Sequence, residues 1–475
     1  MMKNILFGKI IISIAVFLFG LMVFSLLQNQ TIFDYSLGKV AFTFANKVDS
    51  TTLDKKTQIV RTSRSFTTLD EDNFIRWDVG FYKYMSEKGY GTDNSWPGVG
   101  TFAFSPLFPF VWHMSHLSAK YIVILNYALF ALSLMLLTSL FISKTDYSQT
   151  DQLLIFAFAL TLPSVFSFYI PYCESTFMFT FSLALWGLFR GKHWLFYVAM
   201  VACTLSRPSF LIVGLAFIAT DFYLFLLNKN FKLFIKELAM KLWPIVLGMF
   251  ITFFIQYLYC GSFFKMFQVH SQLWGHNFQY PTKFTDWSAE SWGLNVFSIS
   301  CLILPVLFFL VLNLVVHYKT GKIPAVRLFS RVNKRDYLQF FCSIYFVGNF
   351  LFVMLAQGGN LNGLHRYIMA SPLFYVFIFI MIPRLKGMKK SSNIILVIIL
   401  GLIGYFILIH GPYTPKMTFL YMGFFLSILS FLYIFTFNLM KARRKIVYLS
   451  IIILLNTIWL GYLFNHFLNN AYIIA

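Results

Sequence analysis

The chain has 475 residues, of which 59% are hydrophobic, 20% aromatic and only 12% charged. Its mean hydropathy of +0.71 is that of an integral membrane protein and excludes an ordinary soluble domain. The net charge of +21 would fit a nucleic-acid-binding protein. However, the basic residues lie in short clusters between apolar runs, as the positive-inside rule requires, so we expect no nucleic-acid partner.

Five cysteines are scattered along the chain and lie mostly inside apolar runs: Cys173, Cys203, Cys260, Cys301 and Cys342. Their odd number and irregular spacing exclude a disulfide framework and a zinc motif. No soluble domain, low-complexity linker or internal repeat stands out. We therefore expect a single integral membrane domain over 1–475.

The first apolar run, 5–27, follows Lys3 and has no small-residue cleavage site after it. It predicts an uncleaved anchor with a cytoplasmic N-terminus. Residues 28–105 then hold nine of the seventeen acidic residues, which indicates a long first extracytoplasmic loop. The proline-broken stretch 106–118 is too interrupted for a span, and we expect it to dip into the membrane or lie on it.

The richest part of this loop, 73–109, contains Asp78 directly after Arg76 and Trp77. On a helix, the face of Asp78 would also carry an apolar stripe: Phe74, Trp77, Phe81 and Met85. An acid beside such a stripe indicates an amphipathic helix at the membrane surface, with the carboxylate aimed at something specific. The plainer alternative is a solvated acid on an interfacial helix.

Helix-end signals flank this stretch. Thr68 and Glu71 have the spacing of a capping box, which predicts a helix start upstream of Asp78. Gly89 predicts the end of the helix, because glycine readily adopts the left-handed conformation that stops one. The first loop is therefore expected to contain amphipathic helices.

Further apolar runs are candidates for transmembrane helices: 121–142, 152–171, 175–189, 194–206, 208–228, 242–260, 294–316, 337–356, 367–383, 392–409, 417–439 and 447–467. Together with the anchor, they predict an all-α polytopic membrane protein with about 12–13 transmembrane helices. The stretch 194–228 is interpreted as two short spans that meet at Arg207. A single span would reverse the orientation of every later helix and place the later basic loops on the extracytoplasmic side.

Basic residues occupy alternate loops between these runs: 190–192, 229–241, 319–335, 384–390 and 441–445. With a cytoplasmic N-terminus, all five loops fall on the cytoplasmic side. The extracytoplasmic side then receives the first loop together with the remaining ones: 169–175, 206–209, 261–293, 357–366 and 410–416. Everything polar and unusual thus lies on one face.

Besides Asp78, that face carries Glu174, Arg207, His365 and Arg366 at the ends of apolar runs. Ionisable groups at membrane depth are costly and usually face an interior or a substrate path. Two plainer alternatives stay open. The arginines could snorkel to the interface, and Glu174 could cap a helix.

The histidines do not form a metal motif. His113 and His116 are three residues apart, but no acid accompanies them in a ligand pattern. His270 and His276 share the loop 261–293 without metal-ligand spacing. We expect no metal site.

Three runs carry a family resemblance: RWDVGFYKYMSEKGY…FAFSPLFP, then YIPYCESTFMFTFSLALWGLFRGKHWLFYVAMVACTLSRPSF, then HRYIMASPLF. They resemble the PIG-V-type GPI mannosyltransferases and their bacterial relatives, which belong to the GT-C class of membrane glycosyltransferases. The first two runs agree with the family in order and spacing, and the third agrees loosely. The resemblance covers the first half of the chain well and the second half mainly through its hydropathy.

The chain departs from the family pattern at three places. The family commonly has a histidine or another polar group shortly after Trp-Asp, where this chain has Gly80 and Phe81. Its FFP-type turn is 104–106 (Phe-Ser-Pro) here, and its Arg-Ser-Asn turn is 207–209 (Arg-Pro-Ser). These differences leave the donor sugar and the acceptor open.

The resemblance implies a lipid-phosphate sugar donor, a catalytic acid in the first external loop and no nucleotide-sugar domain. Transfer from such a donor needs a carboxylate that takes the proton of the acceptor hydroxyl, a role we assign to Asp78. It also needs cations at the departing phosphate, for which Arg207 and Arg366 are candidates. No cofactor is expected, because two arginines can neutralise the phosphate. Further substrate-binding residues are expected to be Arg76, Trp77, Glu174 and His365.

The sequence therefore predicts a glycosyltransferase with a GT-C-like fold in a bacterial cytoplasmic membrane. It would move a hexose, with mannose the first choice, from a polyprenyl-phosphate-linked sugar to a lipid or glycan acceptor on the extracytoplasmic or luminal face. One alternative is a polyprenol-linked sugar flippase or other transporter, although charges and broken helices near mid-membrane would then be expected. The other is a non-catalytic scaffold of a glycan assembly complex, which would not need Asp78.

Overall fold

The computed structural model describes the following residues: 71–93, 96–141, 148–308, 310–311, 315, 334–385, 390–411 and 442–468. Within these ranges the chain is helical and has no strand, only an isolated parallel bridge between Thr285 and Asn360. The all-α prediction is confirmed for this part of the chain. The anchor at 5–27, the capping residue Thr68 and the span at 417–439 lie outside the described residues.

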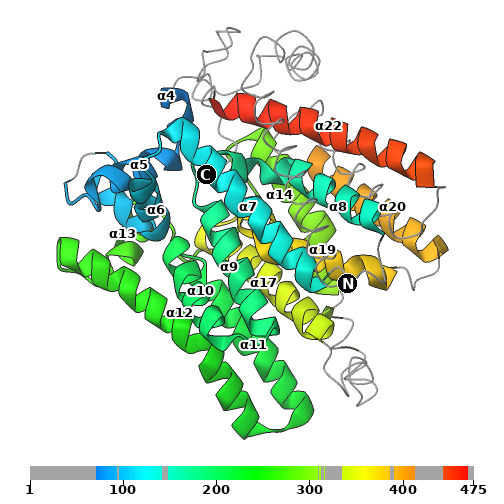
Figure 1. Cartoon of the computed structure of the whole chain (residues 1–475), viewed down its shortest axis with the longest axis horizontal. Helices are drawn as coiled ribbons and strands as arrows, with labels where there is room; N and C mark the ends of the chain where they lie inside the picture. The colour runs from blue at the N-terminus through cyan, green and yellow to red at the C-terminus, as the bar shows by residue number, and fades with distance from the viewer. Residues whose placement is uncertain are drawn as a thin grey trace.

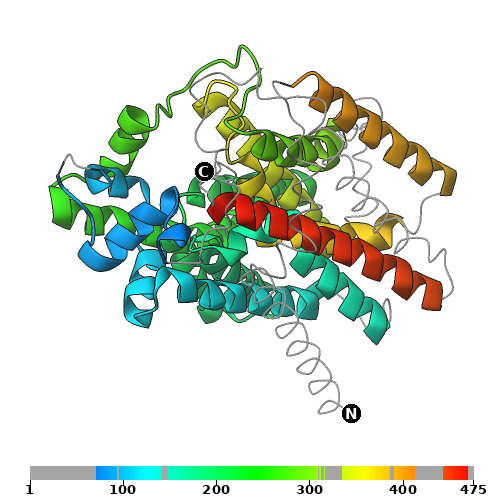
Figure 2. The ribbon, with the colours of Figure 1, turned by 90° about the horizontal axis from the view of Figure 1, so that it is seen from above.

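The described chain begins with short elements: α4 (Glu71–Phe74), α5 (Asp78–Lys88), the 3-10 turn η3 (Gly98–Ala103) and α6 (Leu107–Ser115). A series of mostly longer helices follows: α7 (Ala119–Phe141), α8 (Gln149–Thr161), the 3-10 turn η4 (Pro163–Tyr169), α9 (Glu174–Phe189), α10 (His193–Ser206), α11 (Phe210–Asn228) and α12 (Phe231–Cys260). The last part comprises α13 (Lys265–Leu273), α14 (Ala289–Ser298), the π segment η5 (Ile299–Ile303), α17 (Lys334–Ala356), α18 (Leu364–Met369), α19 (Pro372–Leu385), α20 (Lys390–Ile409) and α22 (Ala442–Leu468). Two views place α5, α6 and α13 on one side of the molecule and α20 and α22 on the other (Figures 1 and 2).

Among the described residues, four helices are long and apolar enough to cross a membrane: Ala119–Phe141, Phe231–Cys260, Ser291–Phe308 and Tyr337–Ala356. Shorter apolar helices accompany them: Thr150–Thr161, His193–Ser206, Phe210–Leu226 and Ile398–Ile407. With the hydrophobic composition, these helices are the mark of a helical, membrane-embedded protein. The total of 12–13 spans stays a prediction.

Helices α9 to α12 run up and down, so that their ends alternate between the two ends of the bundle. α10 packs against both α9 and α12, and α11 packs against α12 and α17. The chain breaks between Ser206 and Phe210, which confirms two helices within 194–228. The start of α9 and the end of α10 therefore share one end of the bundle, and the basic residues near Arg190 and Lys229 lie at the other.

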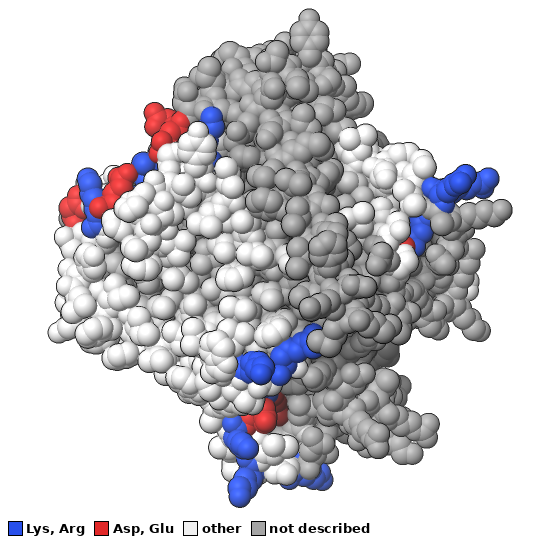
Figure 3. All heavy atoms as spheres, viewed as in Figure 1, with Lys and Arg blue, Asp and Glu red and all other residues white. Residues whose placement is uncertain are grey.

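Charge is distributed unevenly on the surface. On the face shown in Figure 3, acidic side chains gather over α4 and α5, where lysines accompany them. At the turn between α11 and α12 and at the start of α22, by contrast, Lys and Arg side chains predominate. This agrees with the alternation of basic loops in the sequence.

Three predicted spans have wrong boundaries. The run 152–171 is not one helix, because α8 ends at Thr161 and Leu162 is extended, with ψ 134°. Pro163 explains the break, since proline has no N–H and excludes the helical conformation from the residue before it. The helix predicted to start at 242 begins at Phe231, so three lysines expected in the preceding loop, Lys232, Lys236 and Lys241, lie on α12. Within 367–383, the chain breaks before Pro372 into α18 and α19.

Buried polar contacts fix the turn that leads into α9. The side chain of Asn126 in α7 donates to the carbonyl oxygens of Ile170 at 2.7 Å and Tyr172 at 3.0 Å. Rings of the same two helical elements stack beside it, with Phe130 and Phe168 4.1 Å apart. Asn126 therefore ties the residues between η4 and α9 to α7.

Candidate active site

Asp78 is the first residue of α5, and the chain bends sharply just before it. α4 ends at Phe74, and Trp77 has a left-handed conformation with φ 52°, which is uncommon for a bulky side chain. The single helix predicted to carry Phe74, Trp77 and Asp78 on one face is therefore wrong. The bend makes Asp78 the first residue of α5, where the positive end of the helix dipole favours a carboxylate.

Four charged side chains from distant parts of the chain meet at Asp78, and we call them the charge cluster. Arg366 donates from Nη1 to Asp78 Oδ2 at 3.0 Å. Its Nε lies 3.0 Å from Glu174 Oε1, and Arg207 Nη2 lies 3.6 Å from the same oxygen. The structure thus brings together the predicted base and three of the predicted substrate-binding residues. Their two negative and two positive formal charges cancel.

Each member of the charge cluster lies at or next to a helix end. Glu174 is the first residue of α9, and Arg207 is the extended residue after α10. Arg366 lies in the short helix α18, which follows α17. Their ion pairs bring these segments together at the end of α10, whereas the basic turn between α11 and α12 follows the opposite end of α11.

Exposure falls across the charge cluster from Asp78 to Glu174. The Asp78 side chain is 13% exposed, that of Arg366 8%, that of Arg207 3%, and Glu174 is fully buried. A buried carboxylate is costly unless it is paired, and Glu174 has both guanidinium groups beside it. We infer that Glu174 is the inner anchor of the cluster and that a molecule approaching from outside meets Asp78 first.

Burial raises the pKa of Asp78 above that of an ordinary aspartate, and the positive charge of Arg366 opposes this rise. A raised pKa makes the carboxylate a stronger base, which suits proton removal from a hydroxyl. For Arg366, burial alone would lower the pKa, but Glu174 and Asp78 outweigh burial and raise it. The guanidinium therefore stays charged.

Aromatic rings support both arginines. The Arg207 guanidinium lies 4.4 Å from the ring centre of Tyr367, and that of Arg366 lies 5.3 Å from the ring centre of Tyr172. Such cation–π contacts gain strength when water is excluded. Sequence analysis missed both tyrosines, although each lies within two residues of a predicted site residue.

The remaining predicted residues surround the charge cluster. Arg76 donates from Nη2 to Asn73 Oδ1 at 3.3 Å. Trp77 is 37% exposed at the bend itself. His365 is buried and bonds through its backbone N–H and its ring to Asn295. Asn295 was missed, although a polar residue near the start of the apolar run 294–316 is a recognisable signal.

Among the described residues, no three His, Cys, Asp or Glu side chains gather closely enough to hold a metal ion. His113 contacts the Ser86 carbonyl oxygen through Nδ1 at 2.7 Å. The Nδ1 atoms of His270 and His276 lie 3.2 Å apart, a contact that their sequence spacing did not reveal. The reaction without a metal stays a prediction.

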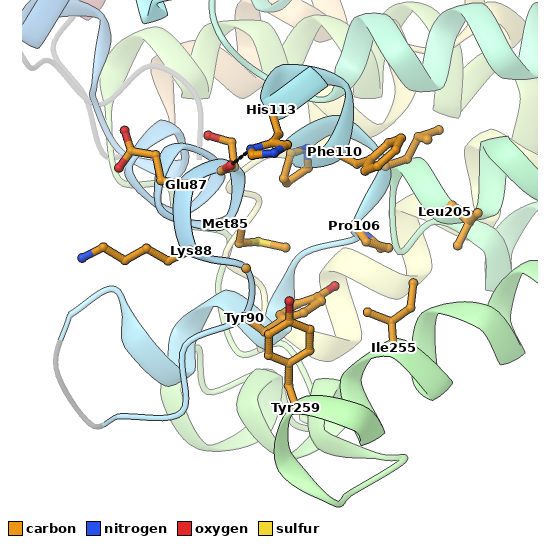
Figure 4. Close-up of a pocket in the computed structure, with 14 residues that line it drawn as sticks. Met85, Glu87, Lys88, Tyr90, Pro106, Phe110, His113, Leu205, Ile255 and Tyr259 are labelled. Carbon is orange, nitrogen blue, oxygen red and sulfur yellow. Dashed lines mark hydrogen bonds between the residues drawn. The ribbon is translucent and has the colours of Figure 1, made fainter. Parts of the chain in front are cut away.

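A cavity of about 520 Å³ lies at the other end of α5 (Figure 4). Its lining is mostly apolar: Met85, Tyr90, Pro106, Leu107, Pro109, Phe110, Leu205, Ile255 and Tyr259. Met85 follows Asp78 by seven residues, which is about 10 Å along a helix, so the cavity is separate from the charge cluster. The two are nevertheless neighbours, because Leu205 precedes Arg207 by two residues.

Gly89 closes one side of this cavity. It has φ 75° and ends α5, as the sequence predicted. A Cβ at this position would collide with the hydroxyl of Tyr259 in α12. The glycine therefore permits both the helix end and the close approach of α5 to α12. Glu87, Lys88 and His113 supply polar groups at the rim (Figure 4).

Comparisons of this chain with protein-family models, with curated proteins and with solved structures gave no match. The class is therefore defined by the fold and the site. It is a helical, membrane-embedded protein with a charge cluster at one end of its helix bundle. An apolar cavity lies beside that cluster.

Proposed function

We propose that this protein is a membrane glycosyltransferase of the GT-C class, similar to the PIG-V-type mannosyltransferases. It transfers a hexose, with mannose the first choice, from a polyprenyl-phosphate donor to a lipid or glycan acceptor. The reaction takes place on the extracytoplasmic face of a bacterial cytoplasmic membrane. One observation carries the proposal: Asp78, the most exposed member of the charge cluster, has a raised pKa and lies 3.0 Å from the Arg366 guanidinium.

In this reaction Asp78 takes the proton of the acceptor hydroxyl while the hydroxyl oxygen attacks the anomeric carbon. The bond from that carbon to the phosphate oxygen breaks, and polyprenyl phosphate leaves with the electron pair. Charge develops on the phosphate in the oxocarbenium-like transition state. Arg366 neutralises this charge, because it is the more exposed of the two arginines. Arg207 lies deeper and holds Glu174.

The contact between Asp78 and Arg366 couples donor binding to base strength. In the free protein, the positive charge of Arg366 lowers the pKa of Asp78 against the effect of burial. A donor phosphate that accepts hydrogen bonds from Arg366 would shield Asp78 from that charge. Asp78 would then become a stronger base when the donor is bound, which is when a base is needed.

The apolar cavity suits a segment of the polyprenyl chain. Its volume of about 520 Å³ falls in the range of small-molecule sites, and its lining offers mainly hydrocarbon and aromatic surface. It shares the end of α10 with the charge cluster. One donor could therefore contact Arg366 through its phosphate and fill the cavity with its lipid.

The central experiment is a transfer assay. Purified protein in liposomes is given polyprenyl-phosphate mannose or glucose with a panel of lipid and glycan acceptors, and products are identified by mass spectrometry. We expect a glycosylated product that Asp78→Asn abolishes and that Asp72→Asn, a change at an exposed acid of α4, leaves intact. A donor that only changes leaflet, chemically unaltered with every acceptor, would establish a flippase instead.

Filling the cavity tests the lipid site. Ile255→Trp places a larger ring in the lining, and Leu258→Trp is the control because Leu258 on the same helix is 67% exposed. Each displaced CH₂ group of the lipid costs about 0.8 kcal/mol, so loss of two raises the donor KM roughly tenfold. A donor with a shortened chain should show a smaller effect. Equal donor KM values in Ile255→Trp and the control would remove the cavity from the proposal.

A further inference from the structure

The helix that carries Arg366 is short and has no cap of its own. α18 has six residues, and Gly363 before it has no side chain to accept a hydrogen bond from the first turn. The first N–H groups of any helix need acceptors, which a neighbouring Asn, Asp, Ser or Thr usually supplies. Here the acceptor comes from another helix, because Asn295 Oδ1 in α14 accepts from the His365 N–H at 2.7 Å.

Two backbone groups determine how the Asn295 amide is oriented. The Leu361 carbonyl oxygen, at 2.8 Å, can only accept, so it must face Nδ2. The His365 N–H can only donate, so it must face Oδ1. His365 Nδ1 lies 2.9 Å from that same oxygen and therefore carries a proton. Asn295 thus holds His365, the residue before Arg366, at two atoms.

Asn295 is itself held firmly. Its Nδ2 also contacts Asp286 Oδ2 at 2.5 Å and Ser291 Oγ at 3.2 Å. Ser288 caps α14 by accepting from the Ser291 N–H at 3.0 Å, so the first turn of this helix is well defined. A side chain with this many partners has little freedom and can transmit its position to α18.

The backbone reinforces this arrangement. Thr285 donates to the Gly359 carbonyl oxygen at 3.1 Å and accepts from the Leu361 N–H at 2.9 Å. The segment before α14 is therefore paired with the segment before α18. Asn295 joins these paired segments to His365, the residue before Arg366.

We propose that Asn295 is a positioning residue, which caps α18 from α14 and thereby holds the Arg366 guanidinium against Asp78. This inference rests on the proposed function and deepens it, since it concerns the same site. It adds a residue that touches no substrate and that the sequence did not single out. Asp286 supports this arrangement, because its carboxylate accepts a hydrogen bond from the Asn295 amide.

The main test is Asn295→Ala. Loss of the cap lets Arg366 move away from Asp78, so we expect weaker donor binding, by about tenfold. Arg366 lowers the pKa of Asp78, so its movement should also shift the acid limb of the pH–rate profile to higher pH. A merely structural residue would leave that limb in place. Hydrogen exchange of the amides of 364–369 should become faster.

A matched control and a rescue sharpen the test. Ser298→Ala changes a buried residue of the same helix whose hydroxyl donates to the Leu294 carbonyl oxygen of α14 at 3.1 Å. This variant should leave all three measurements unchanged. Asn295→Asp restores the capping oxygen but faces Asp286. The double variant Asn295→Asp/Asp286→Asn removes that repulsion, so it should recover more of the wild-type pH profile than Asn295→Asp alone.

Binding of polyprenyl phosphate alone separates this inference from the proposed function, because it needs no transfer. If wild-type protein binds this probe but transfers no sugar, the proposed function fails, and the inference stands provided that Asn295→Ala weakens binding. If Asn295→Ala lowers only the Tm, with the acid limb and probe binding as in Ser298→Ala, the inference is wrong even if the enzyme is real.

Discussion

One group of buried charges lies on α11 and a second lies just before it, and the two groups are built differently. In the second half of the helix, Asp221 receives Lys241 Nζ on both carboxylate oxygens, at 2.7 and 2.8 Å. Just before the helix begins, Arg207 joins the charge cluster. There Arg207 Nη2 and Arg366 Nε lie near Glu174 but make no hydrogen bond to any residue in the described part of the chain.

This difference in construction distinguishes a structural ion pair, Asp221 with Lys241, from a candidate ligand-binding site, the charge cluster. The side chains of Asp221 and Lys241 are 3% and 6% exposed and join two consecutive helices, and Lys241 Nζ also lies 3.4 Å from Glu237 Oε2, so the charges of this group are met within the protein. The charge cluster joins four distant segments, lets two guanidinium groups share one oxygen of Glu174 and is most exposed at Asp78. A cluster that is open at one side can exchange a partner for a ligand, whereas a closed pair cannot.

The largest expected effect distinguishes the two aspartates. Asp78→Asn cannot accept a proton, so turnover should fall by about 10²–10⁴ while the protein stays folded. Asp221→Asn should leave turnover per folded molecule unchanged. Initial rates normalised to folded protein decide the point. Substantial turnover in Asp78→Asn would move the base elsewhere, with Glu174 next, and loss of turnover in folded Asp221→Asn would break the comparison.

The next effect concerns the stability that the ion pair between Asp221 and Lys241 provides. Lys241→Met leaves Asp221 buried without its cation and should cost roughly 3–5 kcal/mol of unfolding free energy. The double variant Asp221→Leu/Lys241→Met should recover most of that loss, because two apolar side chains need no partner. Denaturation of the purified variants measures both values. A double variant no more stable than Lys241→Met would show that the pair has a role beyond joining α11 to α12.

Local sequence patterns predicted much of the fold and the members of the site. Hydropathy placed the helices, Gly89 ended α5, and Arg207 marked the break between α10 and α11. The charged residues at the ends of apolar runs proved to be neighbours, because ionisable groups at membrane depth must find one another. The four members of the charge cluster were thus recognisable one by one.

Contacts between distant segments were beyond these patterns. Helical periodicity predicted one helix through α4 and α5, whereas the chain bends at Trp77. It also gave no sign that Asp78 pairs with Arg366, 288 residues away. The residues around Asn295 in the sequence do not predict that it caps a helix 70 residues later. The length of α12 was underestimated because its first turns are basic, although lysines on an exposed helix face are stable at the membrane surface.

A smaller effect is expected at the exposed arginine of the charge cluster. Arg366→Ala removes a charge-assisted contact to phosphate, which should cost about 1.5–3 kcal/mol, or roughly ten- to a hundredfold in kcat/KM. Arg366→Lys should recover part of this, because lysine keeps the charge but not the planar fork. Steady-state kinetics with varied donor give the values. If Arg366→Ala binds the donor as tightly as wild type, Arg366 is a structural residue and the cluster resembles the closed pair.

The smallest expected effect is a displacement in pH. Because burial raises the pKa of Asp78, kcat/KM should fall with decreasing pH at a value above the ordinary aspartate pKa of about 3.9, and Arg366→Ala should move that limb higher still. Stability should change in the opposite direction. Folded protein with a raised carboxyl pKa binds more protons than unfolded protein, so the contribution of Asp78 to stability is lost as pH rises from about 4 through its folded pKa. Relative to wild type, Asp78→Asn should therefore gain in Tm over the pH range in which wild-type activity appears. An acid limb that is unmoved in Arg366→Ala, or a Tm difference that does not change with pH, would show that Asp78 is not the titrating group.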